Sequence, residues 1–218
     1  EVYVNHNMGA EAVKAFEAAI KLEPRNPRYL QAYAVLLEKN RKFQKALRQW
    51  KRVLTQAGRR NAVISREARR RMISLWKRDG RLEIEISRME ETFAQEPVNP
   101  GVGGFLGAVY LNLRRRDDAE RVFTRVIKAH PKDVDALVGL ELVYTRQNKL
   151  DAAIKILFRL SAANTRSASE YMHRAADMAL SLGKQELALD CMRKVVELNP
   201  ADPQAHTRVA ELHQRMGS

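Results

Sequence analysis

Residues 100–131 read PGVGGFLGAVYLNLRRRDDAERVFTRVIKAHP, and the fold prediction starts from this stretch. Its apolar and small residues recur every three or four positions, which is the spacing of an amphipathic helix. The first run carries Leu106, Gly107 and Tyr110, and the second carries Ala119, Phe123 and Val126. Pro131 cannot continue a helix and closes the stretch. The pattern therefore predicts two helices packed against each other as a hairpin.

The same pattern returns at a fixed distance along the chain. Tyr144 follows Tyr110 by 34 residues, and Ala153 follows Ala119 by 34 residues. A fixed period of this length indicates stacked helical repeats. The repeat resembles that of the tetratricopeptide repeat (TPR) family in its length and in its placing of small and aromatic residues. That resemblance implies an all-α, right-handed α-solenoid of about five to six antiparallel helix hairpins.

The resemblance divides the chain into one continuous solenoid of residues 1–218. We expect repeats at 1–26 (partial), 27–65, 66–99, 100–133, 134–168, 169–202 and 203–218 (partial or a cap). Because the chain begins inside a repeat, we expect it to be a piece of a longer protein. The repeat that starts at residue 66 follows the one that starts at residue 27 by 39 residues, whereas the regular interval is 34. Five extra residues therefore lie in about 56–65. They either lengthen a helix or form a longer loop.

Residues 82–86 alternate apolar and acidic side chains, as a strand does. We nevertheless expect a helix there, because tertiary context overrides a weak local propensity. Glu85 stands where the other repeats place a small alanine. In the last helix we expect Val209 and Ala210 to face inward.

The charge of the chain is uneven. The formal net charge is +13, and the segment 41–88 alone holds 16 Lys and Arg against 4 Asp and Glu. Such an asymmetry bears on partners and not on fold. The single cysteine excludes an intramolecular disulfide, which fits a reducing compartment without fixing one. No stretch is long and apolar enough to span a membrane, so we expect a soluble protein, cytoplasmic or periplasmic.

No catalytic residue, metal site or cofactor is predicted. The five histidines lack the spacing of a metal-binding motif. Cys191 lies among apolar residues of a second helix and is interpreted as structural. The glycines of residues 101–107 do not follow a strand, as a phosphate-binding loop would require. Close helix approach accounts for Gly107, but it does not account for Gly104.

In the TPR family the first helices of the hairpins line a concave groove that binds peptides. The resemblance maps this groove onto Arg70, Ser74, Lys77, Gly104, Ala108, Asn112, Val138, Leu142 and Arg146. We expect an apolar peptide side chain near Gly104, the peptide backbone at Asn112, and acidic peptide residues toward Arg70 and Lys77. The alternative is that these residues form solvated helix faces without a ligand.

A basic patch is a second candidate surface. It comprises Arg59, Arg60, Arg66, Arg69, Arg71, Arg78 and Arg81. Such a patch attracts anionic polymers or acidic proteins, although a run of charge is more often a solvated face. Specific RNA binding would require exposed aromatic rings for stacking, and the two tryptophans fall at inward positions.

We therefore expect a non-catalytic scaffold that binds a segment of a partner protein. One alternative is an electrostatic binder of a polysaccharide, a nucleic acid or an acidic protein. A second alternative is a recruiting or regulatory arm of a larger enzyme or secretion complex. Self-association through the ends of the solenoid is also open. The sequence does not identify the partner.

Overall fold

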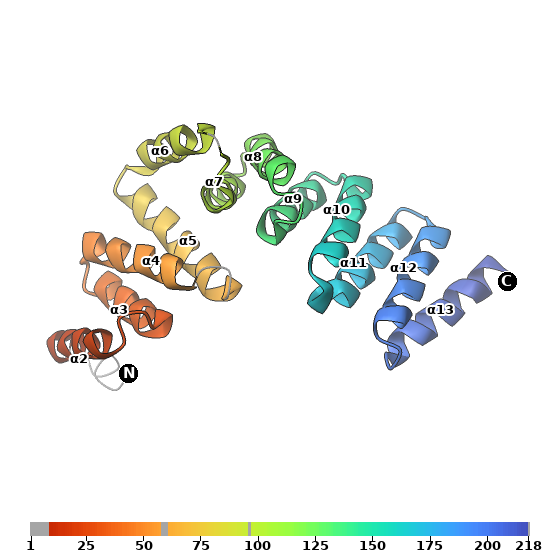
Figure 1. The fold of residues 1–218 in the computed structure, drawn as a ribbon, viewed down its shortest axis with the longest axis horizontal. Coiled ribbons are helices and arrows are strands. Elements are labelled where there is room, and N and C mark those ends of the chain that lie inside the picture. Colours follow the sequence, from red (N-terminus) through yellow and green to blue (C-terminus); the bar gives the residue numbers. More distant parts are fainter. Residues whose placement is uncertain (1–8, 58–60, 96, 218) are drawn as a thin grey trace. The chain divides into compact units, whose positions relative to one another are not determined.

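A computed structural model describes residues 9–57, 61–95 and 97–217 (Figure 1). These residues form twelve α-helices and one short 3₁₀ turn, and no strand occurs among them. The helices are α2 (Gly9–Leu22), α3 (Pro27–Lys39), α4 (Phe43–Ala57), α5 (Ala62–Arg78), α6 (Leu82–Ala94), α7 (Pro100–Asn112), α8 (Arg116–Ala129), α9 (Val134–Arg146), α10 (Leu150–Ala163), α11 (Ala168–Ser181), α12 (Gln185–Leu198) and α13 (Pro203–Met216); the 3₁₀ turn is η1 (Thr165–Ser167). None of these helices is both long and apolar enough to cross a membrane.

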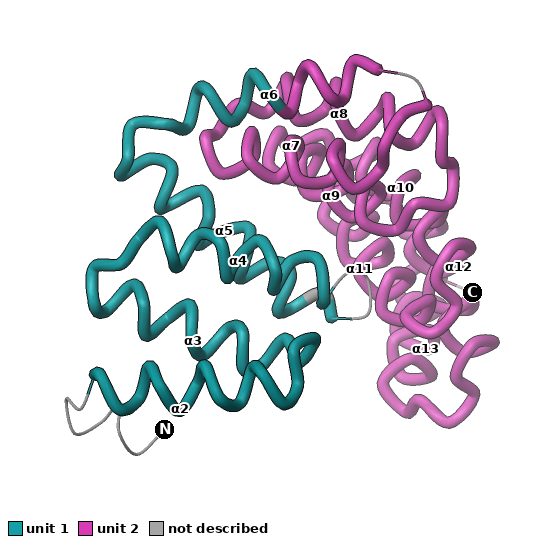
Figure 2. Tube along the Cα trace, turned by 60° about the vertical axis from the view of Figure 1, so that its left-hand side comes forward, with its two compact units in different colours: residues 1–88 teal, residues 89–218 magenta. Residues whose placement is uncertain are grey.

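The helices gather into two compact units. Unit 1 comprises residues 1–88 and unit 2 comprises residues 89–218, with the boundary inside α6 (Figure 2). Within each unit, consecutive helices pack together, as α3 does with α4 and α7 with α8. The first helices of successive hairpins also touch, since α3 contacts α5 and α7 contacts α9. Each unit is thus a stack of helix hairpins.

One residue in every hairpin turn adopts the left-handed conformation. The positive φ angles fall at Arg41, Gly80, Arg114, Asn148 and Gly183. This conformation reverses the chain between two helices, and only glycine adopts it without strain. The successive intervals between these five residues are 39, 34, 34 and 35. The turn residues therefore reproduce the repeat period, the five-residue excess and a slip of one residue before the last complete hairpin.

The five extra residues lengthen helices. Helix α5 has 17 residues, whereas the first helices α3, α7 and α9 have 13 each. Helix α4 has 15 residues, against 14 in α8 and α10. The connection between α4 and α5 is as long as the connection between α8 and α9. The second hairpin consequently begins at Ala62, four residues before the predicted start near Arg66.

The core follows the repeat pattern. Ala46, Ala119, Ala153 and Ala188, one from each of four second helices, are completely buried. Small side chains at these points let two helices approach closely, where a larger one would strain the packing. Larger buried side chains fill the spaces between hairpins, and Trp50, Tyr110, Leu157 and Met192 are among them.

Two expectations about individual helices have different outcomes. Residues 82–86 form the start of α6, so the helix prediction is confirmed. Glu85 in that helix is 9% exposed and forms ion pairs with Arg81 at 3.1 Å and Arg88 at 3.5 Å. In α13 the inward assignment is wrong for Ala210, which is exposed, and Val209 is only half-buried. Ala205 and Leu212 are buried instead, because they lie seven residues apart on the face of α13 that packs on α12.

Successive hairpins are also tied by arginines. Arg125 of α8 donates to the carbonyl oxygen of Ala94 at 3.1 Å, and Arg159 of α10 donates to that of Pro131 at 3.2 Å. Unit 1 repeats the contact, since Arg52 of α4 donates to the carbonyl of Pro24 at 3.2 Å. Ala94 is the last residue of α6, where carbonyls lack intrahelical donors. Pro24 and Pro131 lie two residues beyond the ends of α2 and α8, so there the arginines bind the connection that follows the preceding hairpin.

Candidate functional site

Three glycines of unit 2 are required by close packing. A methyl group at Gly103 would come within 3.0 Å of side-chain atoms of both Val126 and Phe93. A methyl group at Gly107 or at Gly139 would come within 3.0 Å of the Phe123 ring. One aromatic ring of α8 therefore lies between α7 and α9 and is accommodated by a glycine on each of them. The expectation that close approach accounts for Gly107 agrees with this geometry.

Gly104 has a different environment. A methyl group at Gly104 would meet no atom beyond its own helix within 4 Å. Gly104 lies in the middle of α7, where glycine costs roughly 1 kcal/mol relative to alanine. Its φ angle is not positive, so neither the backbone nor the packing of the chain requires a glycine there. Gly104 is itself a buried residue of α7, so what lies open is the small space that its side chain would occupy.

The predicted groove residues of unit 2 lie along two neighbouring helices. Ala108 and Asn112 follow Gly104 by four and eight residues on α7, and Ala108 is half-buried and Asn112 exposed. On α9, Val138, Leu142 and Arg146 recur every four residues. Residues at this spacing share one face of a helix. Since α7 contacts α9, the two lines of residues belong to adjacent helices.

The α9 line is the apolar part of this face. Leu142 has 36% of its surface exposed. Val138 is half-buried and Arg146 is exposed. Asn112 already has a contact within the chain. The name "α7–α9 face" is used below for Gly104, Ala108, Asn112, Val138, Leu142 and Arg146.

A buried carboxylate lies beside the α7–α9 face. The side chain of Glu141 is 3% exposed, pairs with Arg174 of α11 at 2.7 Å and accepts a hydrogen bond from Thr145 at 2.9 Å. Breaking a buried pair by removing one partner leaves an uncompensated charge. The Glu141–Arg174 pair therefore fixes α9 to α11, and sequence analysis did not find it because the partner is 33 residues away.

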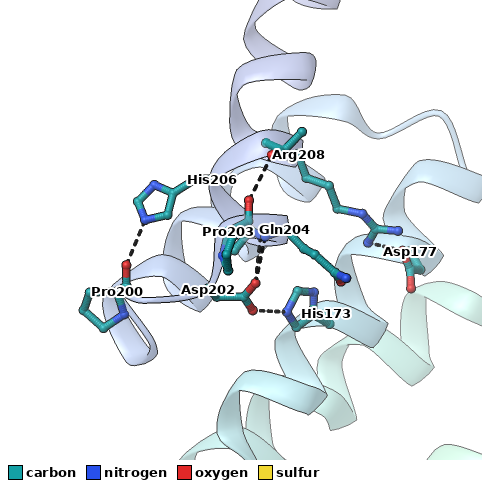
Figure 3. Close-up of polar contacts among 10 residues, drawn as sticks. His173, Asp177, Pro200, Asp202, Pro203, Gln204, His206 and Arg208 are labelled. Atoms are coloured by element: carbon teal, nitrogen blue, oxygen red, sulfur yellow. Dashed lines mark hydrogen bonds and ion pairs between the residues drawn. The ribbon is translucent and has the colours of Figure 1, made fainter.

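The next two first helices are joined by polar contacts (Figure 3). Asp202, the N-cap of α13, accepts backbone hydrogen bonds from Gln204 and Ala205 and approaches His173 of α11 at 3.2 Å. These hydrogen bonds lower the pKa of the Asp202 carboxyl, chiefly through the amide of Ala205 and the His173 ring. Arg208 of α13 pairs with Asp177 of α11 at 2.7 Å. The polar side chains at this end of unit 2 thus bind one another.

The remaining predicted groove residues lie on α5 in unit 1. Arg70, Ser74 and Lys77 are all exposed. Arg70 pairs with Glu67 of its own helix at 2.5 Å, with 67% of its side chain still exposed. These three residues form a separate exposed face of unit 1.

Comparison with known protein families decides the classification. A tetratricopeptide-repeat model matches residues 2–62 and 106–169, and a second tetratricopeptide-repeat model matches residues 169–202. The chain belongs to the tetratricopeptide repeat family. Residues 63–105, which hold most of α5 and all of α6, lie outside both matches.

Known TPR relatives and structures resemble parts of this chain. Cellulose synthase operon protein C of Xanthomonas axonopodis pv. citri (strain 306) is 28% identical over 134 residues, which are 57% of this chain and 9% of that protein. The protein of the same name from Pseudomonas fluorescens (strain SBW25) is 27% identical over 128 residues, 56% of this chain and 10% of that protein. This TPR chain thus spans about a tenth of the length of these relatives.

Two solved structures resemble the fold. The crystal structure of YrrB, described as a TPR protein with an unusual peptide-binding site, is 16% identical and has a TM-score of 0.46. That match covers 89% of this chain and 97% of YrrB. MamA AMB-1 is 21% identical with a TM-score of 0.49, covering 71% of this chain and 84% of MamA. Neither likeness bears on what this chain binds.

The basic patch of the TPR chain is largely occupied by internal contacts. Arg71 binds both Glu67, at 2.8 Å, and Glu38, at 3.3 Å. The hydrogen bond from Arg71 is the main reason that the pKa of the Glu67 carboxyl is lowered. Arg81 pairs with Glu85, and the Arg78 guanidinium lies 3.1 Å from the centre of the Phe43 ring.

The other members of the patch differ in exposure. Arg66 is exposed and Arg69 is half-buried and has a contact within the chain. Arg59 and Arg60 lie outside the described residues. These arginines form one run of charge in the sequence, whereas the acceptors Glu38 and Glu67 are seen only in the structure.

Neither a reactive cysteine nor a metal-binding cluster is found among the described residues. Cys191 is buried, and burial raises the pKa of its thiol to about 11. A thiol with so high a pKa is a weak nucleophile at neutral pH, since the thiolate is the reactive form. Among residues 9–57, 61–95 and 97–217, no group of three or more His, Cys, Asp or Glu side chains could hold a metal ion.

Proposed function

We propose that this TPR chain is a non-catalytic scaffold whose α7–α9 face binds a segment of a partner protein. The single observation that supports it most is the open space at Gly104. The chain keeps a glycine there at a cost to helix stability, although no neighbouring atom demands it. A cost retained without a packing reason is expected where function needs the space.

The α7–α9 face suits a ligand that has an apolar side chain next to a polar or acidic group. Leu142 and Val138 offer apolar surface on α9, and the space at Gly104 lies on the adjacent α7. Arg146 lies one turn beyond Leu142 and can bind a carboxylate or a backbone carbonyl of the ligand. Buried apolar anchors in small pockets usually contribute most of the binding free energy of such interfaces. The expectation that acidic ligand residues reach Arg70 and Lys77 stays a prediction.

Gly104→Gln tests the proposal directly. The variant fills the space beside α7 and also removes the glycine penalty, so the fold should persist. Thr124→Gln on the exposed side of α8 is the matched control. Twelve-residue peptides selected by phage display against the unaltered chain would serve as probes, with affinities measured by fluorescence anisotropy.

We expect the selected peptides to lose at least about tenfold in affinity on Gly104→Gln, a loss of roughly 1.4 kcal/mol. They should bind the Thr124→Gln control as they bind the unaltered chain. Equal affinity for all three proteins would show that peptides bind elsewhere, and would overturn the proposal.

The charge of unit 1 favours a second candidate function, electrostatic binding of an anionic polymer. Residues 1–88 hold 21 Lys and Arg against 9 Asp and Glu, whereas residues 89–218 hold 18 against 17. Binding of this kind weakens steeply with salt. Polymer affinity that falls with rising salt and ignores Gly104→Gln would favour this candidate over the scaffold.

A further inference from the structure

A basic pocket of about 430 Å³ lies in unit 1, and none of its lining residues belongs to the α7–α9 face. Helices α2 and α4 form its two sides, and both are second helices of their hairpins. Tyr33 of α3 lies between them. The lining residues are Glu17, Ile20, Lys21, Tyr33, Lys45, Arg48, Gln49 and Arg52. Four of these eight side chains are cations and one is an anion. None of them belongs to the basic patch predicted from the sequence.

The cations are arranged in a line. Lys45, Arg48 and Arg52 are spaced by three and four residues, so they share one face of α4. Lys21 faces them from α2. All four side chains are exposed. These cations on two sides of the pocket produce a positive potential that attracts anionic groups.

Internal contacts leave most of this charge uncompensated. Glu17 is the one carboxylate in the lining, and it accepts a hydrogen bond from the Tyr33 hydroxyl at 2.7 Å. Arg52 donates to the carbonyl oxygen of Pro24 and to the side chain of Gln49, which orients its guanidinium without neutralising it. Within the described residues, no ion pair involves Lys21, Lys45 or Arg48.

The length of the pocket limits which ligands it can bind. Lys45 and Arg52 are seven residues apart, which is about 10 Å along a helix. An extended peptide covers that distance with about three residues, and its side chains at positions i and i+2 point to the same side. Two carboxylates at i and i+2 would therefore both face the α4 cations. Arginine suits this task because its planar fork binds a carboxylate through two parallel hydrogen bonds.

The same pocket is poorly suited to nucleic acid. Single strands bind to basic grooves by stacking bases on exposed aromatic rings. Tyr33, the one aromatic residue of the lining, is only 7% exposed, and the neighbouring Trp50 of α4 is completely buried. The lining thus offers charge without a stacking surface.

We infer that the pocket between α2 and α4 binds an acidic segment of a partner protein that carries two carboxylates at positions i and i+2. This site is independent of the α7–α9 face and would act as a second contact for the same or another partner. Glu17 limits its positive charge, so the pocket holds both the attractive groups and a repulsive one.

A synthetic peptide tests the inference on the full chain. The probe is a fluorescein-labelled hexapeptide with glutamates at positions 2 and 4 and glycine elsewhere, and its analogue carries glutamine at both positions. Lys21→Gln with Arg48→Gln removes one charge from each side of the pocket. Lys14→Gln with Lys51→Gln is the matched control, because it removes the same charge from exposed positions of α2 and α4 outside the lining. Glu17→Gln removes the negative charge and keeps an acceptor for the Tyr33 hydroxyl.

We expect the pocket double variant to lose about tenfold in affinity for the glutamate peptide, as two exposed ion pairs would give. The control double variant should lose less than about twofold, and Glu17→Gln should bind about two- to fivefold more tightly. Equal losses in both double variants would mean diffuse attraction, and would overturn the inference. So would a thymidine oligonucleotide that binds more tightly than the peptide and depends on the same pocket residues.

Discussion

Units 1 and 2 build the same kind of hairpin from different sequences. Unit 2 is nearly neutral and keeps turn intervals of 34 and 35 residues, whereas unit 1 is strongly basic and contains the interval of 39. Both units nevertheless bury alanines at the helix crossings and place a left-handed residue in every turn. The comparison shows that the fold depends on the crossing and turn residues, while surface charge and helix length remain free to vary.

Enlarging a residue at a helix crossing should have the strongest effect on stability. Ala153→Arg puts a long cation into a completely buried position of unit 2, so we expect a loss of at least about 3 kcal/mol in the free energy of unfolding. Glu85→Ala installs the usual small residue at the equivalent place in α6 and should change it by about 1 kcal/mol or less. Urea denaturation of both variants measures the difference, and equal losses would contradict the role given to the crossing position.

Two glycines of unit 2 should respond in opposite ways to the same substitution. Gly139→Ala pushes a methyl group into the Phe123 ring and should destabilise the fold by about 2 kcal/mol. Gly104→Ala meets open space and should stabilise it by about 1 kcal/mol through better helix propensity. Thermal melts of the two variants should therefore shift in opposite directions. A lower melting temperature for Gly104→Ala would show that the space beside α7 is structurally required.

The turn residues predict an effect common to both units. Arg41 of unit 1 and Arg114 of unit 2 hold φ angles of 56° and 60°, which strain a residue with a side chain. Replacing either by glycine, as already found at Gly80 and Gly183, should stabilise the chain by about 0.5 kcal/mol. Denaturant midpoints of the single and double variants would test this. Non-additive effects would mean that the two turns are not independent.

The smallest expected effect is a local dependence on pH at the start of α13. The pKa of Asp202 is lowered from its ordinary value of 3.8. The cap is therefore fully effective above that value and is lost as the pH falls through the lower pKa of the folded state. The protection of the Gln204 and Ala205 amides, measured as the exchange rate relative to the intrinsic rate at the same pH, should fall below about pH 4. Asp202→Asn keeps a capping side chain without a titrating group, so its exchange should lack that step.

The sequence predicted what is carried by local pattern. The 34-residue spacing of Tyr110 and Tyr144 gave the hairpins, and the count from Pro27 gave the five extra residues. In the structure four of these residues lengthen α5 and one lengthens α4. The repeat period gives the number of extra residues but not which helix contains them. The left-handed turns at Arg41 and Arg114 were missed because arginine is not a turn residue by composition.

Long-range contacts limited the prediction of the site. Gly103 and Gly104 are neighbours in the sequence, yet Val126 and Phe93 require one of them and nothing requires the other. Which ring meets which glycine depends on the packing of three helices. Likewise, the charge count of residues 41–88 was correct, but the acceptors that occupy Arg71 and Arg81 could not be read from it. The division into two compact units was not anticipated either.

The arginine ties between hairpins give each unit a direction. Arg125 and Arg159 reach back to carbonyls of the preceding hairpin, and Arg52 does the same in unit 1. Removing a later hairpin strips a donor from a carbonyl of the earlier one, whereas removing an earlier hairpin merely returns an arginine to water. Local unfolding of one hairpin should therefore destabilise the hairpin before it more than the hairpin after it.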